Sequence, residues 1–238
     1  MFDNDVKKFF LDTASKINIE ISDIQMEQFV KYASLLQEWN KFMNLTAVCE
    51  DKDIVIKHFI DSLTIVKYIK KYNCKSFVDV GTGAGFPGIP LKIIMPELNV
   101  TLLDSLGKRV NFLQTVIDEL GLKNIKAIHS RAEDGGRDKN LREKFDCASA
   151  RAVASMNILL EYCMPFVKKG GHFIAMKGSS EEESYENALK ELCGELESED
   201  IFVLPESDFS RRIICVKKIK NLSTTYPRKA GIPKKNPL

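Results

Sequence analysis

FVDVGTGAGFPG, residues 77–88, joins a short apolar run to a cluster of glycines and a proline. Glycines allow positive φ and a close approach of the backbone to a ligand, and a helix that follows them offers free N–H groups. Two overlapping patterns fit: Gly81, Gly83 and Gly85 make G-x-G-x-G, whereas Gly83, Gly85 and Gly88 make the G-x-G-x-x-G of dinucleotide-binding proteins. A purely structural turn is the third interpretation. The stretch therefore predicts a nucleotide-binding loop without naming the nucleotide.

Downstream of the loop, short apolar segments alternate with helical patterns, which predicts a mostly parallel sheet with helices on both faces. Strands are expected at 76–80, 100–104, 125–129, 145–150 and 171–176. Two further strand-like runs, 201–204 and 213–219, are close enough in sequence to pair antiparallel. Dinucleotide-binding domains usually finish parallel, whereas an antiparallel C-terminal strand is typical of class I S-adenosylmethionine (SAM) methyltransferases. We therefore predict an α/β, Rossmann-like fold of that class with a mostly parallel seven-stranded sheet.

Residues 1–72 follow helical periodicity and predict a small helical N-terminal cap. One of its helices opens with a capping box formed by Ser22 and Gln25. A later helix is expected after Ser180, with apolar positions at Leu189, Leu192 and Leu196. The expected organisation is a cap at 1–72, a SAM-binding domain at 73–222 and a basic C-terminal arm at 223–238.

The composition excludes several classes of protein. Hydrophobic residues make up 44% of the chain, but no apolar run approaches the roughly 20 residues that span a bilayer, and the N-terminus lacks a signal-peptide pattern. We therefore expect a cytoplasmic protein without a membrane partner. Six cysteines occur singly and none forms C-x-x-C, which predicts reduced, mostly buried thiols. The three histidines are not at metal-ligand spacing, so no metal site is expected.

The net charge of +2 conceals an uneven distribution. The segment from Arg211 to the end holds nine basic residues and no acidic ones, which leaves 26 basic against 33 acidic residues in the rest of the chain. A cationic end on an anionic body is typical of an arm that binds a polyanion. A solvated basic tail without a partner is the alternative.

Acidic residues around the loop discriminate between the nucleotides. Asp79 stands two residues before Gly81, as in the D-x-G-x-G-x-G pattern of SAM enzymes, where a buried acid helps to hold the methionine ammonium group that NAD lacks. Asp104 ends the second strand, where a carboxylate accepts hydrogen bonds from the ribose hydroxyls of either cofactor. Ala132 and Glu133 follow the third strand, where a backbone N–H and a carboxylate can read the adenine edge or simply begin a helix. Together these positions favour SAM.

The fourth strand bears on the methyl acceptor. Ser149-Ala150-Arg151-Ala152 stands where enzymes acting on exocyclic amines carry [DNS]-P-P-[FYW], and Cys147 is not in the Pro-Cys or Thr-Cys pair of enzymes that attack pyrimidine carbon 5. Guanine N7 is an acceptor that needs neither motif, because its in-plane lone pair is nucleophilic without a general base. Catalysis then comes from alignment of N7 with the methyl group. Arg151 is expected against a phosphate, the SAM carboxylate or guanine O6, with a strand-end salt bridge as the structural alternative.

Several strings of the chain resemble the RsmG (formerly GidB) family of bacterial 16S rRNA guanine-N7 methyltransferases. They are NLTAV, HFIDSL, DVGTGAGFPGIPL, LLDSLGKRVNFL, SRAED, SARAVAS, MKG and YPRKAGIPKKNPL, and they run from about Asn40 to Leu238. The most specific are the P-G-I-P continuation of the glycine loop, D-S-L-G-K-R and the Y-P-R-K tail. Where the family usually has an aromatic residue after the arginine of the fourth strand, this chain has Val153.

The resemblance implies a guanine in the decoding-site loop of 16S rRNA as target, SAM as methyl donor and S-adenosylhomocysteine as product. It implies a SAM site at Gly81, Phe86, Asp104, Ser105, Leu106, Ala132, Glu133 and Arg151, to which the loop pattern adds Asp79, Gly83 and Gly85. Naked 16S rRNA, a precursor particle and the small ribosomal subunit all remain open as the partner. The protein is expected to be monomeric.

Basic residues at the carboxyl edge of the sheet are candidates for gripping the RNA backbone. Arg151 and Lys177 are the expected substrate-positioning residues in the catalytic site. RNA contacts are expected at Asn44, Lys108, Arg109, Arg228 and Lys229. Lys108 and Arg109 begin a helix, where cations are misplaced unless an anion lies close. Asn44, His58, Asp61 and Ser62 lie in family motifs that line the substrate side or only pack helices, and Tyr226 and Phe86 are candidate stacking platforms.

Other functions remain open from the sequence. The chain could methylate another RNA, a small molecule or a protein, with its basic end irrelevant. It could also be a non-catalytic nucleic-acid-binding protein with a degenerate Rossmann-like domain, and an NAD-linked oxidoreductase is the most distant alternative.

Overall fold

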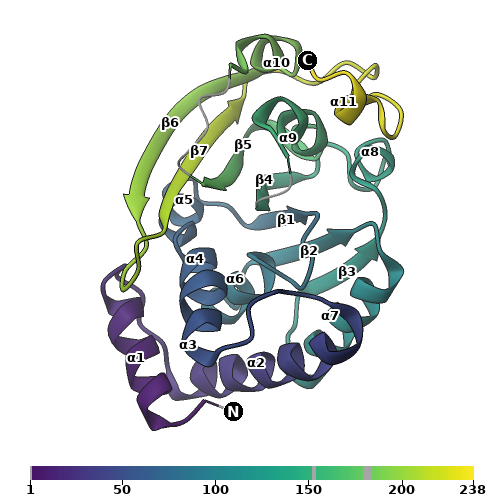
Figure 1. Cartoon of the computed structure of the whole chain (residues 1–238). Helices are drawn as coiled ribbons and strands as arrows, with labels where there is room; N and C mark the ends of the chain where they lie inside the picture. The colour runs from purple at the N-terminus through teal and green to yellow at the C-terminus, as the bar shows by residue number, and fades with distance from the viewer. Residues whose placement is uncertain (1, 152–153, 179–183) are drawn as a thin grey trace.

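A seven-stranded sheet forms the centre of the computed structural model, which describes residues 2–151, 154–178 and 184–238 (Figure 1). The strands lie in the order β3-β2-β1-β4-β5-β7-β6. Their bounds are β1 Ser76–Val80, β2 Asn99–Asp104, β3 Ile125–His129, β4 Phe145–Arg151, β5 Val167–Gly178, β6 Gly194–Val203 and β7 Ser210–Lys218. β7 runs antiparallel to both of its neighbours, and the ladders from β3 to β5 are parallel. The predicted mostly parallel sheet with an antiparallel C-terminal strand is confirmed.

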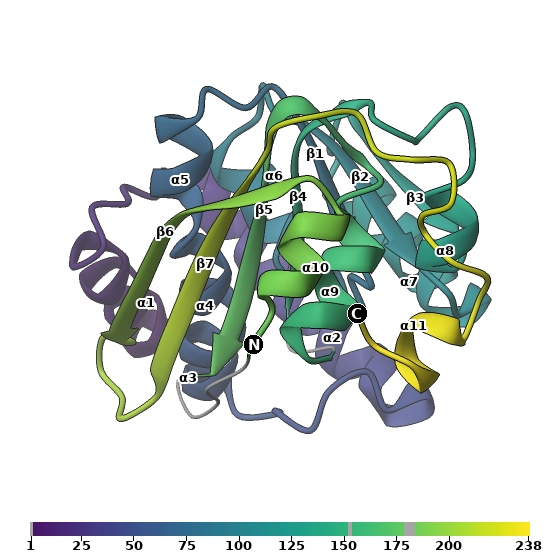
Figure 2. The ribbon, with the colours of Figure 1, turned by 90° about the horizontal axis from the view of Figure 1, so that it is seen from above.

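Helices cover both faces of the sheet. In Figure 2, α9 and α10 lie in front of it and α2 lies behind. The helices that follow the glycine loop are α6 Gly88–Ile94, α7 Gly107–Glu119, α8 Ala132–Gly135, α9 Met156–Cys163, α10 Glu186–Glu191 and α11 Ile232–Lys235. Successive strand side chains point to opposite faces. Phe77 therefore belongs to the hydrophobic cluster with α6 and α7, and Val78 to the cluster with α9 and α10.

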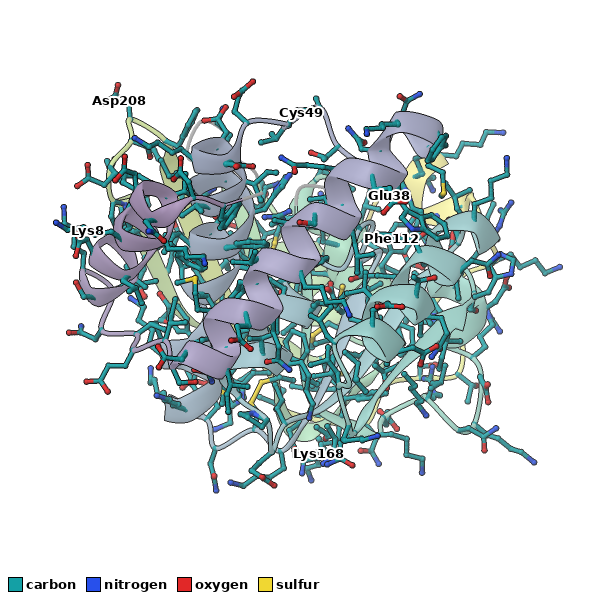
Figure 3. The ribbon with its side chains drawn as sticks, turned by 90° about the horizontal axis from the view of Figure 1, so that it is seen from below. Lys8, Glu38, Cys49, Phe112, Lys168 and Asp208 are labelled. Atoms are coloured by element: carbon teal, nitrogen blue, oxygen red, sulfur yellow. A yellow bond between two sulfur atoms is a disulfide. The ribbon has the colours of Figure 1, made fainter. Side chains whose placement is uncertain are left out.

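Residues 4–71 contain a series of helices that share the core of the sheet. They are α1 Asn4–Ser15, α2 Asp23–Met43, α3 Asp51–Ile54, the π-helix η1 Val55–Ile60, α4 Asp61–Leu63 and α5 Val66–Lys71. The predicted capping box of Ser22 and Gln25 is present at the start of α2. Figure 3 shows α2 crossing the underside beside α7, and the rings of Trp39 and Phe112 are 5.5 Å apart between centroids.

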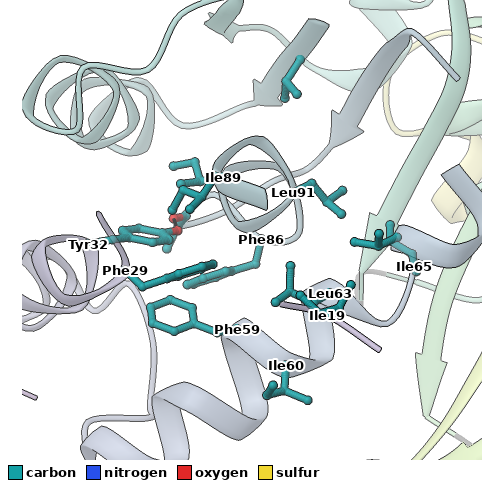
Figure 4. Close-up of a cluster of buried hydrophobic side chains, with 14 of the residues drawn as sticks. Ile19, Phe29, Tyr32, Phe59, Ile60, Leu63, Ile65, Phe86, Ile89 and Leu91 are labelled. Carbon is teal, nitrogen blue, oxygen red and sulfur yellow. Dashed lines mark hydrogen bonds between the residues drawn. The ribbon is translucent and has the colours of Figure 1, made fainter. Parts of the chain in front are cut away.

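An aromatic cluster joins these helices to the glycine loop (Figure 4). The Phe59 ring lies 4.9 Å from Phe29, 5.6 Å from Tyr32 and 6.2 Å from Phe86, measured between ring centroids. The Tyr32 hydroxyl donates a hydrogen bond to the carbonyl oxygen of Ala84, inside the loop. The N-terminal helices therefore form one packed unit with the nucleotide-binding half of the sheet.

Two sequence-based expectations were wrong. The helix expected to carry Leu196 ends at Glu191, because Leu196 pairs with Val216 of β7 and belongs to β6, while Ser180 lies outside the described residues. Cys74 and Cys147 were expected to be reduced but form a disulfide, with their Cα atoms 6.1 Å apart. The two cysteines are 73 residues apart in the chain and meet because β1 and β4 are neighbours.

We expect Phe59→Ala to lower the free energy of unfolding by about 3–5 kcal/mol, because it removes a buried ring from the centre of the aromatic cluster. Phe42→Ala is the matched control: Phe42 is 79% exposed at the end of α2, so the loss there should stay within about 0.5 kcal/mol. Urea denaturation of both variants measures the difference. Equal midpoints would show that the cluster does not hold the N-terminal helices to the sheet.

Candidate functional site

Five of the eleven predicted cofactor-binding residues line one cavity at the carboxyl edge of the sheet, where β1 lies between β2 and β4, whereas Asp79, Gly83, Gly85, Phe86, Asp104 and Arg151 are not part of its lining. The order of the strands reverses at this point, which is where ligands bind in open α/β sheets. A cavity of about 450 Å³ opens there. Its lining includes Gly81, Ser105, Leu106, Ala132, Glu133, Tyr162, Gly231 and Lys234. Five of these were predicted from the sequence, whereas Tyr162, Gly231 and Lys234 were not among the predicted cofactor residues.

The glycine loop takes a shape that side chains would prevent. Gly85 has φ +101°, and a Cβ atom there would lie 2.4 Å from Ile89 Cδ1 and 2.8 Å from the Tyr32 hydroxyl oxygen. A Cβ on Gly88 would lie 2.3 Å from Leu102 Cδ2 and 3.0 Å from Asp79 Oδ2. The loop therefore needs glycine at 85 for its backbone and at 88 for the close approach of α6 to β1 and β2.

Asp79 is fully buried at the end of β1. Its Oδ2 atom accepts hydrogen bonds from the Thr82 hydroxyl at 2.6 Å and from the Gly88 N–H at 2.8 Å. Its Oδ1 atom is buried and makes no hydrogen bond with the described part of the chain. Burial raises the pKa of this carboxyl to about 6, and the hydrogen bond from Thr82 opposes the rise. A cationic donor such as an ammonium group would satisfy the free oxygen.

Asp104 ties the loop to the end of β2. Its Oδ2 atom accepts from the Gly83 N–H and its Oδ1 atom from the Leu106 N–H, both at 2.9 Å. Each carboxylate oxygen has two acceptor sites, so both atoms retain capacity for a ligand hydroxyl. The residues that follow, Ser105 and Leu106, line the cavity directly. This arrangement agrees with the role expected for a ribose-binding acid.

Glu133 lies at the far end of the cavity and is contacted by the C-terminal segment. It is buried in the first turn of α8, and its Oε1 atom accepts a hydrogen bond from the Gly231 N–H at 2.9 Å. Ala132 opens the same helix, where the first N–H groups have no intrahelical partner. One carboxylate oxygen and these N–H groups can still pair with the edge of a purine. The polypeptide segment around Gly231 thereby forms one wall of the predicted adenine pocket.

Arg228 anchors that segment to the body of the protein. Its side chain donates to both oxygens of Glu161, a residue that is 1% exposed, at 2.6–3.1 Å, and its backbone N–H donates to Oε1 at 2.7 Å. The hydrogen bonds to Glu161 raise the pKa of Arg228 above its usual value. Arg142 adds hydrogen bonds to the carbonyl oxygens of Leu222, Ser223 and Tyr226. From the sequence, Arg228 was predicted to bind RNA. No local pattern around it indicates that its partner is Glu161, which lies 67 residues earlier in the chain.

Arg151 lies at the centre of a second group of side chains. Its Nη1 atom donates to the Lys57 carbonyl oxygen at 3.1 Å and to Asp61 Oδ2 at 3.2 Å. Its guanidinium carbon lies 5.0 Å from the centroid of the Phe86 ring, on which the His58 ring stacks at 4.5 Å. Burial, and then the charge of Arg151, lower the pKa of His58 to about 3, so this imidazole is neutral at physiological pH.

Asp61 bridges two arginines. Its Oδ1 atom accepts from Arg211 Nε at 2.8 Å while its other oxygen holds Arg151. The group therefore holds two arginine side chains on a single carboxylate. Arg211, on β7, was not predicted as a site residue, because no local pattern around residue 211 indicates a partner 150 residues away.

The predicted RNA-binding residues are divided between two places. Asn44, Lys108 and Arg109 come together around a second cavity of about 410 Å³ that shares Ser105 and Leu106 with the first. Lys229 is exposed on the C-terminal segment. Lys177 is the penultimate residue of β5, is largely buried and donates to the Ala154 carbonyl oxygen at 3.3 Å. Val153, where the family usually has an aromatic residue, lies outside the described residues.

The family model described as rRNA small subunit methyltransferase G matches residues 25–212. The chain belongs to this family. Ribosomal RNA small subunit methyltransferase G of Acetivibrio thermocellus is 52% identical over 98% of this chain and 97% of its own length. The protein of the same name from Alkaliphilus oremlandii is 49% identical over 98% of this chain and 99% of its own length. The family membership expected from the loop, tail and strand motifs is confirmed.

Solved structures support the fold more widely. A crystal structure of MtNAS in complex with MTA and tNA aligns with a TM-score of 0.56 at 13% identity, and covers 90% of this chain and 75% of that one. No helix within the described ranges is long and apolar enough to cross a membrane. Within the same ranges, no group of three or more His, Cys, Asp or Glu side chains could hold a metal ion.

Asp79 makes the stability of the protein depend on pH in an unusual direction. Its pKa rises from 3.8 to about 6 on folding, so the wild type loses stability as pH rises through this window. Between pH 4 and pH 7, the free energy of unfolding of wild type should fall by about 2.5 kcal/mol relative to Asp79→Asn. Asp146 should show the opposite trend at lower pH: hydrogen bonds, the first of them from Lys168, lower its pKa to about 2, so wild type should lose stability relative to Asp146→Asn as pH falls from about 4 to 2. A pH-independent difference for Asp79→Asn, measured by urea denaturation, would refute this assignment.

Replacing Arg228 should release the C-terminal segment. We expect Arg228→Gln to accelerate hydrogen exchange of the amides at residues 226–235 at least tenfold, because it leaves buried Glu161 without its partner, a loss of about 3–5 kcal/mol. Lys229→Gln is the matched control, since Lys229 is exposed on the same segment. Equal exchange in the two variants would mean that the ion pair does not hold the segment in place.

Proposed function

We propose that this protein transfers the methyl group of SAM to N7 of a guanine in the decoding-site loop of 16S rRNA, releasing S-adenosylhomocysteine. The observation that carries the proposal is the buried, unpaired oxygen of Asp79 beside a glycine-lined cavity, in a chain whose family is rRNA small subunit methyltransferase G. The methionine part of SAM carries an ammonium group, which could donate the hydrogen bond that Asp79 Oδ1 does not receive from the described residues. NAD has none, which argues against the dinucleotide alternative.

The residues of the cavity fit the other parts of SAM. Asp104, beside Ser105 and Leu106, is in position to accept from the ribose hydroxyls. Ala132 and Glu133 offer a donor and an acceptor to the adenine edge, and Gly231 fixes the orientation of the Glu133 carboxylate. SAM, when bound, supplies an electrophilic methyl group on a sulfonium. The contribution of the protein is then to hold this group in line with the acceptor and to exclude water.

The side chains around Arg151 suit an acceptor that needs no proton removed. Guanine N7 attacks through an existing lone pair, so the reaction calls for alignment and not for a base. His58 agrees with this, because an imidazole with a pKa of about 3 is a poor base at neutral pH. Arg151 is held by the Lys57 carbonyl oxygen, Asp61 and the His58 ring, and it keeps further N–H donors for a phosphate, the SAM carboxylate or guanine O6. We propose Arg151 and Lys177 as substrate-positioning residues.

The partner we propose is 16S rRNA or the small ribosomal subunit, met by a monomeric enzyme in the cytoplasm. Along the sequence we retain an N-terminal helical part, 1–72, a SAM-binding domain, 73–222, and a C-terminal segment, 223–238, although the first two share one hydrophobic core. The ion pair of Arg228 with Glu161 favours a structural role for the last segment. Of the two residues predicted there to bind RNA, we propose that only Lys229 contacts it. RNA contacts from Asn44, Lys108 and Arg109 are supported by their convergence on one cavity.

Labelled SAM incubated with the protein and unmodified small subunits, or deproteinised 16S rRNA, tests the function directly. The expected result is label at N7 of a single guanine, located by mapping the modified nucleotide. No incorporation into either substrate would reject the proposal. Calorimetry with SAM and NADH separates a methyltransferase from an oxidoreductase. A weak dependence of substrate binding on salt would favour a small-molecule substrate.

We expect Arg151→Lys to lower kcat/KM for the RNA substrate about tenfold or more, equivalent to about 1.4 kcal/mol. A lysine cannot reproduce the planar contact with Asp61, the Lys57 carbonyl and the Phe86 ring. Arg137→Lys is the matched control, because Arg137 is exposed and, among the described residues, its side chain donates only to the Thr225 carbonyl oxygen. Initial rates of methyl incorporation give the comparison. Equal rates for both variants would show that Arg151 does not position the substrate.

A further inference from the structure

A second cavity adjoins the proposed cofactor pocket on the side of the N-terminal helices. Its volume is about 410 Å³, within the range of small-molecule sites. It lies between the end of α2 and the start of α7. Its lining consists of Phe42, Met43, Asn44, Ser105, Leu106, Gly107, Lys108 and Arg109. Since Ser105 and Leu106 line both cavities, a ligand here would lie next to the ribose end of bound SAM.

The apolar side chains of this cavity are unusually exposed. Phe42 is 79% exposed although the other aromatic residues of α2 pack inward, and Leu106 is 51% exposed on the opposite wall. Two large apolar groups that face one cavity mark a binding surface for a ligand with an apolar face. A planar ring that stacks on Phe42 would cover both, and nucleobases present such a face whatever their sequence.

The polar groups of the cavity favour a nucleotide. Asn44 is the left-handed C-cap of α2, with φ 48°, and its side-chain amide makes no hydrogen bond to any described residue. Lys108 forms no ion pair within the described part of the chain, and Arg109 lies 3.7 Å from Asp104. The first turn of α7 holds no acidic residue that would balance these two cations. A donor-acceptor amide, an aromatic ring and cations together suit a base with its phosphate.

We infer that this cavity binds an unpaired nucleotide of the RNA substrate that neighbours the target guanine. Its base stacks on Phe42 against Leu106, the Asn44 amide pairs with the edge of the base, and Lys108 and Arg109 contact the adjacent phosphate. Such a contact would hold the RNA loop open while the target guanine enters the site beside Arg151. The inference rests on the proposed function, because it takes the ligand from the RNA that the enzyme methylates.

Substitutions at Phe42 test the stacking contact through methyl transfer to whichever RNA substrate the wild type modifies. Loss of one stacked base is worth about 1–3 kcal/mol, so Phe42→Ala should raise KM for the RNA about 5- to 150-fold. The dissociation constant for SAM should change less than about twofold, since Phe42 lines only the second cavity. Phe42→Trp should retain wild-type KM, whereas Phe42→Leu, apolar but not planar, should behave like alanine. Ile24→Ala, at the other end of α2 and 72% exposed, is the matched control.

The phosphate contact has a separate signature. Lys108→Gln should lower the slope of log KM against log salt concentration by about one, the value for a single lost phosphate contact. Phe42→Ala should leave this slope unchanged, because stacking releases no counterions.

Photocrosslinking tests the inference without relying on activity. The full-length protein with p-azidophenylalanine at position 42, irradiated with small subunits, should crosslink to 16S rRNA within a few nucleotides of the methylated guanine. Wild-type KM for Phe42→Ala, or a crosslink to a ribosomal protein, would overturn the subsite while leaving the methyltransferase function intact. If the wild type methylates no RNA, the proposed function fails, and absence of an rRNA crosslink would then overturn the subsite independently.

Discussion

The carboxylate of Asp79 is the constraint on which the rest of the site depends. Through one oxygen it joins the Thr82 hydroxyl and the Gly88 N–H, so the two ends of the glycine loop close on the end of β1. A buried charge is unfavourable at neutral pH, as its raised pKa records. The surroundings tolerate it because α6 approaches closely, which the absence of a side chain at Gly88 permits. The glycine that completes the dinucleotide pattern by spacing therefore serves packing around this acid.

The N-terminal helices form the other half of the site. Tyr32 of α2 holds the Ala84 carbonyl oxygen, and His58 of η1 stacks on Phe86, so both sides of the glycine loop contact these helices. The π-helical turn of η1 also places the Lys57 carbonyl oxygen against Arg151. π-Helical turns are frequent at functional sites because they redirect side chains and carbonyls within a helix. A division into cap and catalytic domain thus describes the sequence better than it describes the packing.

Local patterns predicted the parts of the fold that are decided locally. The strands β1 and β3 begin and end where their apolar runs do, and the acids at 79, 104 and 133 were predicted from their positions near or just after the ends of strands. β6 was partly missed, because its alternating glutamates, from Glu195 to Glu199, also suit a helix surface and only pairing with β7 decides between them. The disulfide of Cys74 with Cys147 and the bridge from Asp61 to Arg211 were not predictable, since each joins residues that only the sheet topology brings together.

The same limit applies to charge. The run of basic residues from Arg211 onward suggested an arm for a polyanion, yet four of its cations are paired with carboxylates from earlier in the chain. The pairs are Arg211 with Asp61, Arg212 with Glu199, Lys218 with Glu143, and Arg228 with Glu161. Lys108 and Arg109 lie in a short, ordinary segment, but they face a cavity whose described lining holds no acidic residue, and only Arg109 lies near a carboxylate, that of Asp104. The positive charge available to RNA therefore depends on which carboxylates the fold brings near each cation. A count of basic residues along the sequence overstates this charge at the C-terminus and understates it at the start of α7.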